Sequence, residues 1–333
     1  MQLYNPLTNQ FGIEGDDLPY HLQVLGLDSQ GFRPGVLFYP LVDHYNTHDS
    51  QWHDQINLRA QRSDVIVFYD LVNTGDYEHG RFTDFISNYN HDCKVYLTVN
   101  QSPNLQLANV KIIPWDFMWN RFKLYYTQSV PWDIRVLHHY AGPDKYKCPE
   151  LTFDWARSRK FLSMCGREYG WRTNLFELLQ SRTDGYVSCR SRGITIEPEE
   201  IRGAFSPVPN RYYLDSYVSI YVESNCVRTD LVHITEKTYE PLLKGHFIMP
   251  FSNPGTISRL KHMGFEFPEF IDYSFDQESD CSQRFTMLTR EFARIMNMDL
   301  GVLYQQHQDL LLHNQRCVTN IDYDRRIQQL YEL

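Results

Sequence analysis

The sequence predicts an α/β protein: two Rossmann-like domains that face each other across a cleft, followed by a helical C-terminal tail. Three observations lead to this fold class. Short continuous apolar runs alternate with helical patterns in both halves of the chain, which is typical of parallel sheets covered by helices on both faces. An irregular, proline-bearing stretch over 129–158 separates the halves. At 333 residues the chain is long enough for two domains.

The first domain is expected over residues 1–150. Its continuous apolar runs predict buried strands, and they cover 35–42, 64–70, 94–100 and 110–114. Between the strands, apolar residues at helical spacing, such as Trp52 and Ile56, predict helices over 49–64 and 80–90. This order of elements is that of a Rossmann-like half.

The second domain is expected over residues 151–333, where the alternation starts again. The pattern predicts strands over 160–165, 217–224 and 246–251 and helices over 170–181, 235–244 and 253–264. In the last of these helices Asn253 is a good N-cap, Pro254 suits the first helical position and Gly264 suits the end. From residue 280 onward the pattern predicts helices only.

The composition predicts a cytoplasmic protein. The start, MQLYNPLTNQ, lacks the segments of a signal peptide, and no apolar run approaches the ~20 residues of a membrane helix. The seven cysteines are scattered and form no CxxC pair, so reduced thiols are expected. The net charge of −9 argues against a general polyanion binder. Nucleic acid is therefore a disfavoured partner, although a local basic groove would still be compatible with the total.

Two loops of the second half are candidates for ligand binding. In an open α/β sheet, ligands bind outside the carboxyl ends of the strands, where helix N-termini attract phosphate. The loop CGREYGWR follows the strand over 160–165 and supplies Arg167 and Arg172, which are suited to bind phosphate oxygens. The segment ESNCVRTDLVHITEK follows the strand over 217–224.

The second segment ends at a helix start with an unusual charge. Thr235 is a plausible N-cap, and Glu236 lies in the first turn, where a carboxylate is favoured. Lys237 is unusual there because a cation opposes the helix dipole. An anion between Lys237 and the free N–H groups would explain it, and Glu236 could accept hydrogen bonds from a ribose diol. These groups match a nucleoside diphosphate; the alternative is a solvated, salt-bridged turn.

The stretch VESNCVRTDLVHITEKTYEPLLKGHF resembles the donor-binding segment of α1,3-fucosyltransferase-like glycosyltransferases and their viral and bacterial relatives. The resemblance covers residues 160–273 and is specific from Thr235 to Gly245. KFLSMCGREYGWRTNLFELL also resembles the segment in which this family places a phosphate-binding Arg, and Arg172 fits that position best. The matching residues are Glu223, Ser224, Thr235, Glu236, Lys237, Tyr239, Pro241, Leu242, Leu243, Gly245, Leu260, Lys261, Gly264 and Phe265.

The resemblance implies the GT-B arrangement, with an N-terminal acceptor-binding domain and a C-terminal nucleotide-sugar-binding domain. It implies inverting sugar transfer that requires no cofactor or metal, with Glu236 on the ribose and Lys237 and Arg172 on the diphosphate. Two departures leave the donor open between GDP- and UDP-sugars: the spacing before Thr235 is longer than in the family, and His233 replaces an aromatic residue. The residues assigned to donor binding are Arg167, Arg172, Glu223, Ser224, His233, Thr235, Glu236, Lys237 and Tyr239.

An inverting transfer needs a base for the acceptor hydroxyl, and the first half supplies two candidates. Asp43 follows the strand over 35–42, and Asp70 closes the strand over 64–70. Both are expected at carboxyl ends of strands, where catalytic side chains gather. Either carboxylate could instead cap the helix that follows it.

Other chemistry has weaker support in the sequence. The stretch DHYNTHDSQWHD is rich in metal-ligand types and includes the pair His44 and His48 at helical spacing, with His53 nearby, but it suits an ordinary helix entry equally well. The Asp-x-Asp pattern at 322–324 matches that of metal-dependent sugar transferases but falls in the helical tail, where a cap or solvated face is expected. No nucleophile elbow is present, so hydrolysis is not expected.

Three functions remain open at this point. The first is a transferase that acts on a glycan or a lipid-linked sugar. The second is a transferase that adds a sugar to nucleic acid, such as a viral modified-base glycosyltransferase, which would need a basic groove. The third is a non-catalytic protein that binds nucleotide sugars.

Overall fold

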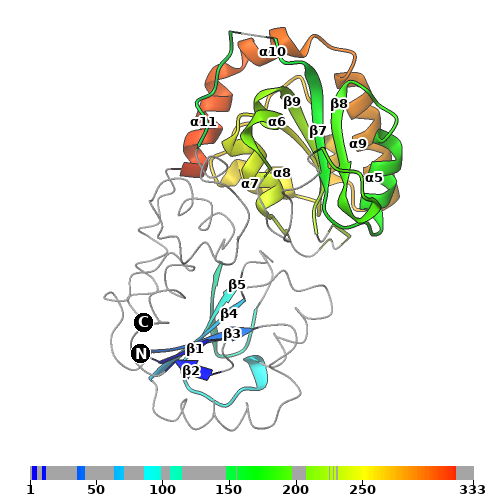
Figure 1. Ribbon diagram of the computed structural model, residues 1–333. Helices are drawn as coiled ribbons and strands as arrows, with labels where there is room; N and C mark the ends of the chain where they lie inside the picture. Colours follow the sequence, from blue (N-terminus) through cyan, green and yellow to red (C-terminus); the bar gives the residue numbers. More distant parts are fainter. Residues whose placement is uncertain are drawn as a thin grey trace. The chain divides into compact units, whose positions relative to one another are not determined.

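The computed structural model describes the chain over 2–5, 10–12, 36–41, 64–70, 86–98, 106–114, 148–154, 156–196, 208–224, 226–227, 229 and 232–319. The chain divides into two compact units, with β1–β6 in the first and β7–α11 in the second. The predicted α/β class with parallel sheets is confirmed (Figure 1). The exact domain boundary at 150/151 and the facing of two domains across a cleft stay predictions.

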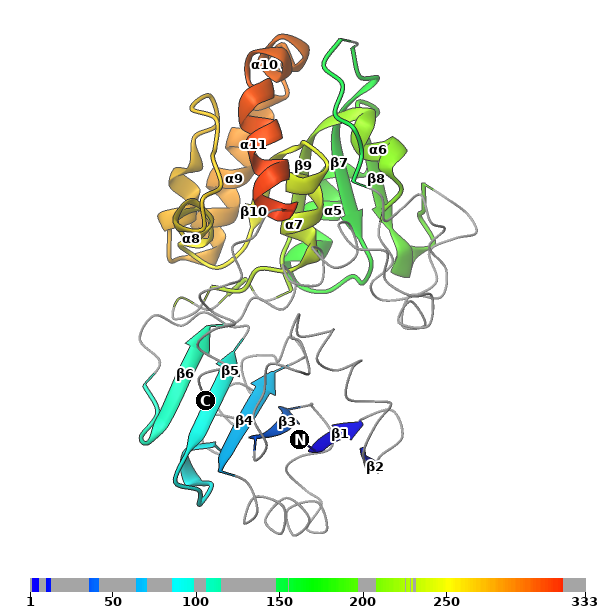
Figure 2. The ribbon, with the colours of Figure 1, turned by 90° about the vertical axis from the view of Figure 1, so that its left-hand side faces the viewer.

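The first unit contains a six-stranded sheet in the order β2-β1-β3-β4-β5-β6 (Figure 2). β1 and β2 pair antiparallel, and all other neighbours pair parallel. The four predicted strands are confirmed as β3–β6, and the short β1 and β2 were not predicted. The bounds are Gln2–Asn5 for β1, Gln10–Gly12 for β2, Val36–Leu41 for β3, Val65–Asp70 for β4, Lys94–Thr98 for β5 and Val110–Pro114 for β6.

The helical turn before β5 is fixed by a buried lysine. Residues 86–88 are helical, within the helix predicted over 80–90. Lys94 is 5% exposed, and its Nζ donates to the carbonyl oxygens of Ile86 at 3.0 Å and Tyr89 at 2.8 Å. Burial lowers the pKa of Lys94. Through these two hydrogen bonds Lys94 supplies donors to carbonyl oxygens at the end of the turn that have no partner within the helix. The helix predicted over 49–64 lies outside the described residues.

The second unit contains a four-stranded, wholly parallel sheet in the order β10-β9-β7-β8. Three strands were predicted and are confirmed, and β8 was not predicted. Because the chain runs from β7 to β8 on one side and continues with β9 on the other, the switch in strand order lies between β7 and β9. The bounds are Arg159–Cys165 for β7, Gly185–Cys189 for β8, Ser216–Val222 for β9 and Phe247–Phe251 for β10.

Helices cover both faces of this sheet (Figure 1). Phe161 of β7 packs edge-on against Phe292 of α9, whereas its neighbour Leu162 packs against Tyr212 and Tyr213 of α6, as the alternation of strand side chains requires. The bounds are Trp171–Leu179 for α5, Asn210–Leu214 for α6, Glu236–Leu243 for α7, Thr256–His262 for α8, Cys281–Ile295 for α9, Leu300–Gln306 for α10 and Gln308–Thr319 for α11. Two 3₁₀ turns, η4 over Arg190–Arg192 and η5 over Tyr273–Gln277, complete the unit.

The predicted start of α8 was wrong. The helix begins at Thr256, and its N-cap is Gly255 with φ of 83°. The side chain of Asn253 is not free to cap it, because its Oδ1 accepts from the backbone N–H of His233 at 3.1 Å. The carboxylate of Asp276 in η5 instead accepts from two N–H groups of the first turn, at 2.9 and 3.2 Å. A residue distant in sequence therefore replaces the expected local cap.

Helix α7 is short and has a fixed end. After Leu243 the chain passes through Gly245, which adopts φ of 70°. A Cβ at this position would lie 2.6 Å from the side chain of Leu151. Both the backbone conformation and the close packing therefore require glycine, and β10 begins two residues later at Phe247.

The remaining expectations on composition concern thiols and the membrane. All seven cysteines are free thiols, as predicted. None of the described helices has the length and apolar character needed to span a bilayer.

We expect one buried histidine, His246, to make the protein lose stability in mild acid. The side chain is 1% exposed; Nε2 lies 2.6 Å from the carbonyl oxygen of Tyr213 and Nδ1 lies 2.8 Å from Oγ of Ser219. These contacts satisfy a neutral ring, which donates from Nε2 and accepts at Nδ1. Burial lowers the pKa of His246 well below its ordinary value.

The sign follows from proton linkage. Below the ordinary pKa of about 6.5 the unfolded chain binds a proton that the native His246 does not, so stability is lost as pH falls, by up to about 1.4 kcal/mol per pH unit. Urea unfolding at pH 7.5, 6.5 and 5.5 measures this slope. The variant His246→Gln should flatten it, and the exposed His262→Gln should leave it unchanged. An unchanged slope in His246→Gln would contradict the assignment.

Candidate functional site

A pocket lies at the switch point of the second sheet. The pocket is partly open to solvent, so its empty space of about 330 Å³ includes open solvent, and it is lined by the carboxyl ends of β7 and β9 together with α5 and α7. Ser163 and Cys165 contribute from β7, Tyr221 from β9, Arg172 from α5 and Lys237 from α7. The carboxyl edge of an α/β sheet at such a point is the usual place for a ligand.

The start of α7 is fixed by the predicted N-cap. Thr235 has extended backbone angles, and its Oγ1 accepts from the N–H of Lys237 at 3.3 Å. The residue is 0% exposed, so the cap is held inside the protein. Glu236 follows in the first turn, where a carboxylate is favourable. The predicted helix start is thus confirmed, and it places Lys237 at the second helical position.

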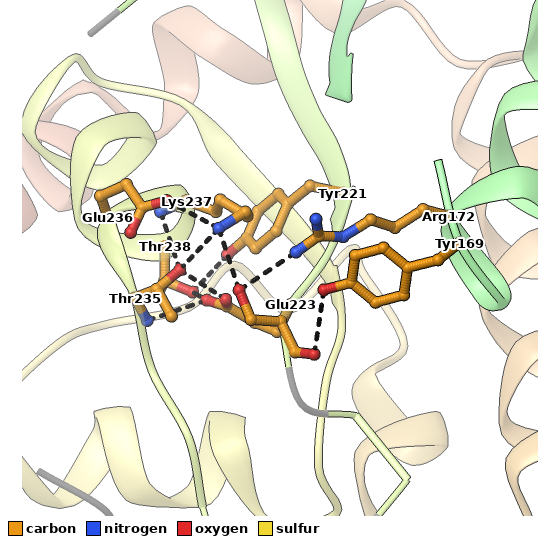
Figure 3. A network of polar contacts seen from close by, with 9 residues as sticks. Tyr169, Arg172, Tyr221, Glu223, Thr235, Glu236, Lys237 and Thr238 are labelled. Atoms are coloured by element: carbon orange, nitrogen blue, oxygen red, sulfur yellow. Dashed lines mark hydrogen bonds and ion pairs between the residues drawn. The ribbon is translucent and has the colours of Figure 1, made fainter. Parts of the chain in front are cut away.

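A buried carboxylate holds this cap in place (Figure 3). Glu223, the residue after β9, is 0% exposed and accepts from Thr235 N at 3.0 Å, Thr235 Oγ1 at 2.5 Å and Thr238 Oγ1 at 2.7 Å. The hydroxyl of Tyr221 donates to Thr238 Oγ1 at 2.8 Å. Along this series of hydrogen bonds the hydroxyl and N–H groups donate, and the carboxylate oxygens of Glu223 accept at its end. The end of β9 is therefore tied directly to the first turn of α7.

Lys237 belongs to that turn and lines the pocket. Its Nζ lies 2.6 Å from Oε1 of Glu236, 3.3 Å from Oγ1 of Thr235 and 3.4 Å from Oγ of Ser224. The side chains of Lys237 and Glu236 are 24% and 21% exposed. An ion pair that solvent still reaches is modest in energy, so an incoming anion could replace Glu236 as the partner of Lys237.

Arg172 approaches the same hydroxyl from α5. Its guanidinium NH2 nitrogen donates to Oγ of Ser224 at 3.1 Å, and its Cζ atom lies over the ring of Tyr169, 4.5 Å from the ring centre. Its Nε is buried and has no hydrogen-bond partner among the described residues. A buried donor of this kind is costly unless something accepts from it. Helix α5, all of which is described, has no side-chain cap and no acidic residue in its first turn.

The two helices repeat one unusual arrangement. Arg172 and Lys237 are each the second residue of their helix, where a cation opposes the helix dipole, and both donate to Oγ of Ser224. Two helix N-termini and two cations are thus directed at one small region beside the pocket. Their positive fields add, and among the described residues the carboxylates of Glu236 and the buried Glu223 oppose them. Charges and donors in such an arrangement are typical of anion-binding sites.

The other predicted donor-binding residues have different surroundings. Arg167 is exposed in the loop after β7. His233 is 2% exposed, and burial lowers its pKa, with the nearby Glu223 acting in the opposite direction. Tyr239 is 0% exposed and packs against Phe265 with ring centres 6.3 Å apart. The structure thus makes Glu223 and Tyr239 interior residues that support the site, and their contact with a donor stays a prediction.

Sequence reasoning missed three contributors to the site: Tyr169, Tyr221 and Thr238. Thr238 lies three residues after the N-cap, which is the position that faces back toward it in a helix, so a signal was present. Tyr169 lies within the same loop as the predicted arginines. Its link to Ser224, an O–H···O contact of 3.3 Å to the backbone oxygen, joins residues 55 apart in sequence and has no local signature.

The candidate bases and metal ligands come from less fully described parts of the chain. Asp70 is the last residue of β4, as predicted, and Asp43 lies outside the described residues. Their catalytic roles stay predictions. The histidines at 44, 48 and 53 and the Asp-x-Asp pattern at 322–324 also lie outside those residues. Within the part that the structure describes, no group of three or more His, Cys, Asp or Glu side chains is placed to hold a metal ion.

Comparisons with known proteins add no assignment. No protein-family model matches the chain, and neither a curated protein sequence nor a solved structure matches it.

Proposed function

We propose that the protein is a glycosyltransferase that transfers a sugar from a GDP- or UDP-sugar to an acceptor hydroxyl, with inversion. In this proposal the second unit binds the nucleotide sugar and the first half of the chain binds the acceptor, each as a Rossmann-like domain of the GT-B type. The single observation that carries the proposal is the convergence of Arg172 and Lys237, from two helix N-termini, on Ser224 beside the switch-point pocket.

The chemistry of the donor explains why these charges are required. The diphosphate of a nucleotide sugar carries two negative charges and gains more as the sugar leaves. Arg172 can offer a planar fork of N–H donors, including the buried Nε, and Lys237 supplies a compact charge. Preorganised cations of this kind stabilise a departing diphosphate without a resident metal or cofactor.

Glu236 has two roles in the proposed cycle. Without ligand its carboxylate is the counter-ion of Lys237, with Oε1 at 2.6 Å from Nζ. When the diphosphate takes this place on Lys237, the carboxylate is released at the mouth of the pocket and can accept hydrogen bonds from a ribose diol. The exchange keeps the lysine paired in both states, so the site avoids an isolated charge in either.

The acceptor hydroxyl must lose its proton as it attacks the sugar. In the proposed mechanism a carboxylate of the first half, Asp70 or Asp43, takes that proton. The sugar–phosphate bond breaks, its electrons pass to the diphosphate oxygen, and the new glycosidic bond forms on the opposite face of the sugar. The products are the glycosylated acceptor and a nucleoside diphosphate held by Arg172 and Lys237.

A calorimetric titration of the full chain with GDP and UDP tests the proposal. Guanosine and uridine are the matched controls because they lack the diphosphate. We expect one of the two diphosphates to bind at least about 10-fold more tightly than its nucleoside, since charge-assisted hydrogen bonds contribute about 1.5–3 kcal/mol each. If neither diphosphate binds better than its nucleoside, the proposal is wrong.

A second assay separates an enzyme from a binding protein. The chain is incubated with a panel of GDP- and UDP-sugars, with and without glycan acceptors, and release of nucleoside diphosphate is measured. Release that increases with an acceptor supports transfer. If the protein binds a nucleotide sugar tightly but releases no nucleoside diphosphate from any sugar in the panel, it is a binding protein and not an enzyme.

A further inference from the structure

An exposed tyrosine beside the anion site needs an explanation. Tyr169 is 49% exposed, yet its side chain is held at two points. Its hydroxyl donates to the backbone oxygen of Ser224 at 3.3 Å, and its ring lies against the guanidinium of Arg172 at 4.5 Å (Figure 3). Tyr169 therefore spans from the loop after β7 to Ser224, two residues after the end of β9.

The contacts around Arg172 form a closed arrangement. The backbone N–H of Arg172 donates to the carbonyl oxygen of Tyr169 at 3.1 Å, its guanidinium donates to Ser224 Oγ, and Tyr169 itself donates to Ser224 O. The guanidinium is thereby held between an aromatic ring and a hydroxyl. A free arginine side chain has many rotamers, and ordering them on binding reduces affinity.

We propose that Tyr169 is a positioning residue that holds the guanidinium of Arg172 in the orientation that binds the diphosphate of the donor. This inference rests on the proposed function, and it adds a residue that acts through Arg172. The ring supplies a cation–π surface, which favours the stacked rotamer. The hydroxyl fixes the ring through Ser224, the same residue that receives Arg172 and Lys237.

Two other roles for Tyr169 make different predictions. If the ring stacks on the nucleobase, its removal weakens the binding of a nucleoside as much as that of a diphosphate, whether or not Arg172 is present. If the side chain only stabilises the loop, its removal lowers the free energy of unfolding without a specific effect on anions. Positioning through Arg172 instead requires an effect on the diphosphate that disappears when Arg172 is absent.

A double-mutant cycle on the full chain, with inorganic pyrophosphate as the calorimetric probe, tests the inference. Tyr169→Leu is expected to weaken pyrophosphate binding by about 5- to 10-fold, the cost of ordering one long side chain. Tyr169→Phe keeps the ring and should lose no more than about 2-fold. In an Arg172→Met background, Tyr169→Leu should cause no further loss. Urea midpoints of all four proteins show whether each variant is folded.

The outcomes separate the inference from the function on which it rests. Unchanged pyrophosphate binding in Tyr169→Leu, while Arg172→Met weakens it, would overturn the positioning role alone. An equal loss from Tyr169→Leu with and without Arg172 would also overturn it, and a parallel loss of guanosine or uridine binding would assign the ring to the base. If pyrophosphate and both nucleoside diphosphates fail to bind the unmodified protein, the anion site and the inference fall together.

Discussion

Lys237→Met is expected to weaken nucleoside diphosphate binding by about 30- to 150-fold. The substitution keeps most of the side-chain volume but removes the charge, and loss of one partner from a partly buried charged pair costs about 2–3 kcal/mol. The loss should fall as salt is raised, because the side chain is 24% exposed and screening weakens the interaction that is being removed. Calorimetry at 50 and 300 mM salt measures both effects.

Two control variants make this result specific. Lys261→Met changes the net charge equally at an exposed position on α8, and it should leave affinity unchanged. Glu236→Gln removes the internal counter-ion of Lys237, so it should strengthen binding of pyrophosphate while weakening binding of the nucleoside part. If Lys261→Met lost as much affinity as Lys237→Met, the effect would come from the net charge of the protein. Lys237 would then not be part of the binding site.

Glu223→Ala is expected to destabilise the protein by about 3 kcal/mol or more. The carboxylate is 0% exposed and receives three hydrogen bonds from Thr235 and Thr238. Its removal leaves buried donors without an acceptor, and it also creates a cavity beside the helix start. Glu223→Gln should cost less, about 1–2 kcal/mol, because one oxygen remains but the new N–H₂ group faces a donor.

Urea unfolding of the three proteins at pH 7 measures these differences. The exposed Glu269→Ala is the matched control and should stay within about 0.5 kcal/mol of the unmodified protein. Because Glu223 accepts two hydrogen bonds from Thr235, the N-cap of α7, we expect Glu223→Gln also to weaken diphosphate binding although it removes no group from the pocket. Stability of Glu223→Ala equal to that of Glu269→Ala would show that the network does not support the fold.

The elements that sequence reasoning found share one property: their signal is local. The apolar runs that became β9 and β10 are continuous because both faces of each strand are buried, and the centre of β7 is buried in the same way. β8 was missed because it starts with Gly185, a residue that normally weakens a strand prediction. Gly185 pairs with Phe161, and a Cβ there would lie 2.3 Å from its ring. The glycine is thus required by a neighbour 24 positions away.

The candidate site divides in the same way. The charge of Lys237 at a helix start was visible in the sequence because it breaks a local rule. The contacts of Arg172 and Tyr169 with Ser224, which Lys237 also contacts, were not visible in the sequence. They depend on β7 and β9 being neighbours in the sheet. Strand order is decided by packing over the whole sheet, so no single segment encodes it.

The short α7 has a consequence for how this chain can change its length. The helix runs between a cap tied to Glu223 and a glycine turn packed on Leu151, and β10 starts directly afterwards. One inserted residue would rotate the side chains before it by about 100° relative to those after it, and it would turn Lys237 away from the pocket or break the turn. Neither end of α7 has a loose loop that could take up an extra residue. We therefore expect this segment to tolerate substitutions but not insertions or deletions.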